Sequence, residues 1–163
     1  MILWFFSCHS TPSSELAHFS AKREFIQSIL TSPPEAIDHD PDPNHVQIIL
    51  TAAKHNHEIV DWKTEELILV EGYAYNGITP GPTIRAKIGD RVSVTLTNEL
   101  DDPTTIHWHG LEVPNDMDGI PWVREPVGPG ETFTYSFIVD RESTAWYHPH
   151  IDTDHQVNHG LYG

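Results

Sequence analysis

The sequence predicts an all-β fold in which many short strands form a β-sandwich. Apolar and polar residues alternate with a period of two in several short runs, which is typical of strands with one buried face. Turn residues separate these runs, and the 163 residues include 13 Pro and 10 Gly, which favour turns over long helices. This length fits one domain with some additional chain.

Residues 1–44 are expected to form a tail before the β domain. Apolar residues at helical spacing predict a short amphipathic helix over about 14–31, and a Ser-Pro-Pro sequence ends it. The acidic stretch 38–44, which contains two prolines, predicts a linker. The apolar start, Met1–Phe6, lacks a basic region and gives only a weak export signal, such as a lipoprotein signal ending at Cys8.

The pattern changes to that of strands from residue 45 onward. Strands are expected over 46–52, 67–73 and 91–98, with a turn at Lys54–His57 after the first of them. Asn76-Gly77 is a strong signal for a tight turn, and Gly89-Asp90 predicts another turn. The third strand places its apolar residues on one face and its hydroxyl side chains on the other: Val92, Val94 and Leu96 against Ser93, Thr95 and Thr97.

The second half of the chain continues this pattern of short strands separated by turns. A strand over 106–110 is followed by a long connection, 111–126, and a turn at 128–131. The alternation from Phe133 to Val139 predicts a further sandwich strand. Residues 144–147 then lead into a second histidine-rich segment, in which Pro149 makes a centrally paired strand unfavourable.

Composition excludes several classes of partner. The formal charge of −15 argues against nucleic acid and anionic membranes, because both require a basic face. Cys8 is the single cysteine, so no intrachain disulfide and no thiolate-rich metal site can form. No apolar run is long enough to span a bilayer.

Two His-X-His triplets, His107–His109 and His148–His150, stand out among the 12 histidines. In an extended segment residues i and i+2 point the same way, roughly 6–7 Å apart, so each triplet presents two imidazoles on one face. If the segments lie side by side, four imidazoles converge. Imidazole suits Zn, Cu, Fe and Ni, but a catalytic zinc ion usually takes three protein ligands. Four imidazoles on two strand pairs therefore indicate copper and more than one ion.

Several separate motifs resemble one family in its order and spacing. These are the segments 75–85, 89–92, 105–111, 118–119 and 146–150. Over about residues 46–163 they resemble the first cupredoxin-like domain of multicopper oxidases, which include laccases, ascorbate oxidase and ferroxidases, with a form closer to the bacterial members. The resemblance implies a Greek-key β-sandwich of the cupredoxin (plastocyanin-like) type over 45–163, truncated at its C-terminal end.

The resemblance also implies roles for individual residues. His107 would bind the type 2 copper, and His109, His148 and His150 would bind the type 3 pair of a trinuclear cluster that reduces O2 to water. Asp118 matches a carboxylate that assists proton delivery, although Asp118-Gly119 alone would be taken for a turn. Trp108 and Trp146 are expected to pack around the site. The family has no ligands at the positions of His155 and His159, which are expected at the surface or beside the ligands.

The chain also departs from the family pattern. A type 1 copper site needs a Cys and two His, and neither this site nor the other cluster ligands is present, since Cys8 has no suitable histidines around it. The expectation is a fragment without oxidase activity of its own, which meets O2 and a phenolic or metal-ion donor through missing domains. A homo-oligomer could cover the unfinished sandwich edge, and the location expected from the family is periplasmic or secreted.

Other functions remain open at this stage. The chain could be a non-catalytic module that binds or stores copper. A zinc hydrolase could use the same histidine pairs. An electron-transfer cupredoxin is disfavoured, because a blue copper site needs a cysteine thiolate among its ligands.

Overall fold

The computed structural model describes residues 32–163, and their secondary structure is mostly β. The helix expected over 14–31 and Cys8 lie outside the described residues. Going along the chain, the elements are β1 (His45–Val60), β2 (Leu67–Tyr75), β3 (Arg91–Asn98), β4 (His107–His109), the 3-10 helix η1 (Asn115–Met117), β5 (Thr132–Ile138), β6 (Trp146–His148) and α2 (Thr153–Asn158). The prediction of an all-β fold is confirmed. No helix among the described residues is long and apolar enough to cross a membrane.

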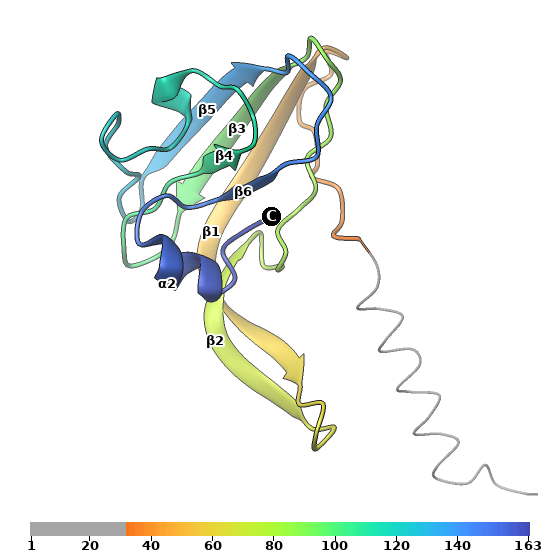
Figure 1. The fold of residues 1–163 in the computed structure, drawn as a ribbon, viewed down its shortest axis with the longest axis vertical. Coiled ribbons are helices and arrows are strands. Elements are labelled where there is room, and N and C mark those ends of the chain that lie inside the picture. Colours follow the sequence, from red (N-terminus) through yellow and green to blue (C-terminus); the bar gives the residue numbers. More distant parts are fainter. Residues whose placement is uncertain (1–31) are drawn as a thin grey trace, which may run out of the picture. The chain divides into compact units, whose positions relative to one another are not determined.

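Four strands form the larger sheet, in the order β2-β1-β3-β5 (Figure 1). β1 runs antiparallel to β2 but parallel to β3, with His45 opposite Arg91, and β3 runs antiparallel to β5. The expected strands over 91–98 and 133–139 correspond to β3 and β5. Their alternation has the predicted consequence, because Val92, Val94, Leu96, Tyr135 and Phe137 are all buried.

The turn expected at Lys54–His57 is wrong. β1 continues through these residues to Val60, which pairs with Leu67 of β2. The chain turns instead over 61–66, where the Asp61 amide donates to the Glu66 carbonyl at 2.9 Å. The polar residues did not end the strand because this half of the hairpin is largely exposed on both faces, so a paired backbone tolerates them.

The turn at Asn76-Gly77 is confirmed. Both residues have positive φ, 53° and 72°, as a two-residue hairpin turn of type I′ requires, and the Ile78 amide donates to the Tyr75 carbonyl. The Asn76 side chain also accepts from the Thr51 amide at 2.7 Å and donates to the Ile49 carbonyl at 2.9 Å. These bonds fix the end of β2 against β1.

The second ladder contains β4 and β6, which pair antiparallel over only three residues each. In Figure 1 both strands lie in front of the larger sheet. β6 ends at His148, in agreement with the effect expected of Pro149. The other edge of β6 pairs with the end of the chain, since Tyr147 and Gly163 exchange two backbone hydrogen bonds of 2.9 and 3.0 Å.

An apolar groove of about 690 Å³ lies beside this pairing. Its lining includes residues 83–84, 86–88 and 141–147 and the core side chains Val92, Trp108 and Phe137. The groove therefore reaches the core side chains of the described residues.

Candidate metal centre

The short ladder sorts its side chains by face. Trp108 pairs with Tyr147 in the middle of the ladder, and both are buried, at 3% and 5% exposure. Trp108 contacts the rings of Tyr135, Phe137 and Tyr147. Since neighbouring residues of a strand point to opposite faces, the core packing of Trp108 and Tyr147 turns the histidines beside them together onto the other face of the ladder.

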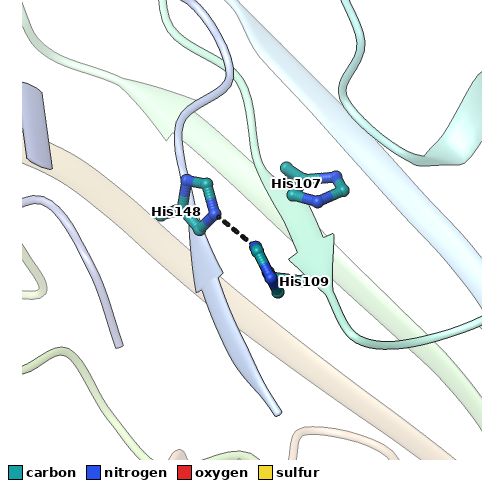
Figure 2. Close-up of side chains that lie close together, drawn as sticks. All are labelled: His107, His109 and His148. Atoms are coloured by element: carbon teal, nitrogen blue, oxygen red, sulfur yellow. Dashed lines mark hydrogen bonds between the residues drawn. The ribbon is translucent and has the colours of Figure 1, made fainter. Parts of the chain in front are cut away.

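Three imidazoles meet on that face, as Figure 2 shows. His107 stands opposite His148 in the ladder, and one ring nitrogen from each of His107, His109 and His148 lies within 4.8 Å of the others. The Nδ1 atom of His109 lies 3.3 Å from Nε2 of His148. Ring centroids of the three residues are 5.3–5.5 Å apart. This donor set fits a metal ion that prefers nitrogen ligands.

His148 is the buried member of the group. Its Nδ1–H donates to the Pro149 carbonyl at 2.8 Å, which leaves the lone pair on Nε2, the atom that faces His109. Burial lowers the pKa of His148 and the neighbouring imidazoles lower it further, while the bond to Pro149 acts in the opposite direction. The neutral form, which is the form that binds metals, is therefore favoured.

His150 is not part of this compact group of three. Its ring centroid lies 5.0 Å from that of His107, with the rings nearly perpendicular, and its backbone amide donates to the Thr105 hydroxyl at 2.9 Å. All four predicted ligands therefore lie in one neighbourhood, with His150 reaching it from the side of His107.

Asp118 contacts His107. Its Oδ1 atom lies 3.0 Å from Nδ1 of His107, and its backbone carbonyl oxygen lies 3.2 Å from the same nitrogen. An Nδ1–H that donates here leaves the lone pair on Nε2 of His107. Asp118-Gly119 is also a turn, as its sequence alone suggests, and Gly119 has a φ of 65°. The turn places the carboxylate beside the imidazole.

The two tryptophans behave differently from each other. Trp146 stacks on His148 with ring centroids 3.9 Å apart and lies 5.2 Å from His109, so it covers one side of these imidazoles as expected. Trp108 belongs to the core on the opposite face of β4, so the expectation that it packs around the site is wrong for this residue. The alternation within His107–His109 already places it there.

Sequence reasoning did not find the side chains that hold the ladder from beneath. The Tyr135 hydroxyl accepts from the Ile106 amide at 2.9 Å, and Gln156, which is buried, bonds Thr104 at 2.7 Å and the Pro103 carbonyl at 2.9 Å. These contacts join residues far apart in the chain, so no local sequence pattern predicts them. Gln156 is buried although polar side chains of short helices are usually exposed. Its burial is stable because both ends of its amide are hydrogen-bonded.

Tyr147→Phe tests how much a buried side-chain hydrogen bond of the ladder contributes to stability. The Tyr147 hydroxyl is buried and donates to the Pro82 carbonyl at 2.7 Å, and burial raises the pKa of its phenol. Removing it leaves that carbonyl unpaired, so the free energy of unfolding is expected to fall by about 1–2 kcal/mol. Urea unfolding of the metal-free chain measures the change. An unchanged midpoint would show that the bond does not contribute, and metal binding should persist in either case.

Comparison with known proteins gives consistent matches. A family model described as multicopper oxidase matches residues 58–163. The chain is 47% identical over 94 residues to Multicopper oxidase MmcO of Mycobacterium tuberculosis, a match that covers 58% of this chain and 18% of that protein. It is 44% identical over 91 residues to Copper resistance protein A of Pseudomonas syringae pv. tomato, covering 55% of this chain and 15% of the relative.

Solved structures agree with the sequence matches. A multicopper oxidase from Campylobacter jejuni, described as a metallo-oxidase, superimposes with a TM-score of 0.72 at 33% identity, covering 82% of this chain and 28% of that one. The chain thus spans less than a fifth of the length of the two curated relatives and just over a quarter of this structure.

Proposed function

Because the chain belongs to the multicopper oxidase family, we propose that residues 45–163 are the first cupredoxin-like domain of such an oxidase and supply half of the ligands of its trinuclear copper cluster. The observation that carries the proposal is the register of β4 and β6, which sets His107 opposite His148 and brings three ring nitrogens within 4.8 Å of one another. His150 lies against the same group.

In this proposal His107 binds the type 2 copper, and His109, His148 and His150 bind the type 3 pair. Copper, when bound, supplies the one-electron chemistry by which O2 is reduced to water. The protein fixes the ligands beforehand. The Pro149 carbonyl orients His148, Asp118 orients His107, and Trp146 shields one side of His148 from water. Such preorientation lowers the entropic cost of metal binding.

Asp118 has a second role in the proposal, which is to hold and pass a proton. Reduction of O2 to water consumes protons, and a carboxylate next to the ligands can deliver them. The Oδ1 atom of Asp118 is shielded from solvent and lies 3.0 Å from Nδ1 of His107. It therefore stands beside the site at which protons would be used.

The groove beside Gly163 supports the view that these residues act within a larger protein. Its lining includes residues 83–84, 86–88 and 141–147 and core side chains such as Val92 and Phe137. We propose that further polypeptide of the oxidase fills this space. The reducing substrate, a phenolic compound or a metal ion, is then met by regions outside these residues, and a periplasmic or secreted location is part of the same proposal.

Copper binding and O2 consumption together test the function. The purified chain is expected to bind copper but to show no steady O2 consumption with a phenolic or Fe(II) donor, because four of its 12 histidines are proposed cluster ligands, half of the set, and it has no type 1 site. Co-expression with the remaining domains of a related oxidase should then restore consumption. Copper binding without such restoration would favour the storage module, and steady turnover by the chain alone, or failure to bind copper, would contradict the proposal.

A further inference from the structure

A second pair of histidines lies on α2, away from the ladder that carries the centre. His155 is on the helix and His159 is its C-terminal cap, so the two are four residues apart, the spacing that places side chains on one helix face. Their ring centroids are 4.1 Å apart at an interplanar angle of 49°. The proposed copper centre uses neither residue.

His159 is held in the tautomer that a metal ligand needs. Its Nδ1 atom lies 2.7 Å from the backbone carbonyl oxygen of His155. A carbonyl oxygen only accepts, so Nδ1 carries the proton and the lone pair is on Nε2. Ligating histidines characteristically donate their other ring N–H to a carbonyl or carboxylate in this way.

His155 can adopt the complementary tautomer. Its Nε2 atom lies 3.2 Å from the Tyr73 hydroxyl oxygen, and the two rings meet edge to face with centroids 5.7 Å apart. When Nε2–H donates to the phenol oxygen, the lone pair is on Nδ1. Each of the two imidazoles then keeps one nitrogen free for a ligand while the other nitrogen is fixed by the protein.

The separation of the rings suits a shared ion. Metal–nitrogen bonds to imidazole are about 2.0–2.1 Å long, so two imidazoles at a right angle on one ion have ring centroids about 4.5 Å apart. The observed separation is 4.1 Å, which is close to that value. His155 is exposed and His159 half-buried, which leaves room for water as the remaining ligands.

Charge favours a cation at this position. Asp152 and Asp154 are exposed beside the first turn of the same helix, and the whole chain carries a formal charge of −15. An excess of negative charge raises the local concentration of divalent cations. The acidic residues are not the site; they increase the occupancy of a site that the imidazoles define.

We propose that His155 and His159 form a second, two-imidazole site for a borderline divalent cation, with Cu²⁺ bound in preference to Zn²⁺, as the Irving–Williams order requires. The site binds its ion independently of the His107–His150 centre, because the two share no ligand. It goes beyond the proposed function and does not depend on it.

Titration of the metal-free chain with Cu²⁺ tests the site, with bound copper measured by equilibrium dialysis and by electron paramagnetic resonance. In H155Q and in H159Q one binding event is expected to weaken at least about tenfold, because a chelate is reduced to a single imidazole. His39→Gln, which changes an exposed histidine elsewhere in the described residues, should leave that event unchanged.

His148→Gln separates this site from the centre. The event assigned to His155 and His159 should persist in H148Q, so that failure of the centre and failure of this site give different titrations. Circular dichroism confirms that each variant is folded before it is titrated. Stoichiometry and affinities in H155Q and H159Q equal to those of the unchanged chain would overturn the site.

Discussion

Replacing Gly119 by Ala is expected to lower the free energy of unfolding by at least about 3 kcal/mol and to weaken metal binding at His107. A Cβ atom at this position would lie 2.1 Å from the Ile106 carbonyl oxygen and 3.0 Å from the His107 amide nitrogen. Both are backbone atoms of the peptide bond at which β4 begins, so the clash can be relieved only by moving the start of that strand. Urea unfolding of the metal-free chain, followed by tryptophan fluorescence, measures the loss.

Gly130→Ala provides the matched control for this substitution. Gly130 also has a positive φ, 76° against 65° for Gly119, but a Cβ there would meet no atom within 4 Å. It should therefore show only the cost of the left-handed conformation, about 1 kcal/mol. If Gly119→Ala is no more destabilising than Gly130→Ala, the close approach of the turn to β4 does not contribute to the fold.

His148→Gln is expected to weaken copper binding at the centre by at least about 100-fold, since even the loss of a group that only orients a ligand costs 10–100-fold. His148 stands between the other ligands, with its Nε2 3.3 Å from Nδ1 of His109 and its ring centroid 5.3 Å from that of His107. Glutamine retains an N–H that can donate to the Pro149 carbonyl but has no imidazole nitrogen. Copper retained after dialysis against a competing chelator gives the affinity.

His45→Gln is the matched control, because it removes a histidine that is not a proposed ligand. His45 is also partly buried and hydrogen-bonded, to Ser93 at 2.9 Å and to Asp40 at 2.7 Å, but it lies at the start of β1. Copper binding at the centre should be unaffected in this variant. Equal affinities in His148→Gln and in the unchanged chain would remove His148 from the ligand set.

Residue patterns predicted those parts of the fold in which one face is buried. The alternation in β3 and β5 leads directly to buried Val94 and Tyr135, because the period of a strand fixes which side chains share a face. Asn76-Gly77 predicted its turn because both residues tolerate positive φ. The end of β1 was mispredicted for the opposite reason, since beyond Lys54 neither face is consistently buried and the pattern carries no information.

For the candidate site, the sequence predicted the positions of some side chains and not of others. The spacing of the triplets was enough to foresee that His107 and His148 converge, provided that their strands pair. The spacing did not predict that His150 approaches from beside His107. Pro149 ends the strand, and residues i and i+2 share a face only within a strand. A role for Asp118 beside the ligands was expected from the resemblance and not from the pattern, and its contact with His107 was not predicted.

The brevity of the β4–β6 ladder has a thermodynamic consequence. Only three residue pairs join two segments that are far apart in the chain, and short isolated ladders are marginally stable in water. In the proposed centre, ions held by His109 of β4 and His148 of β6 would bind the paired strands and not the separated ones, so mass action would add about 2.7 kcal/mol of stability at a free ion concentration 100 times the Kd. Metal supply and folding of this part of the protein are therefore linked equilibria. When the free ion concentration falls, the pairing of β6 with β4 would weaken first, before any change in the larger sheet.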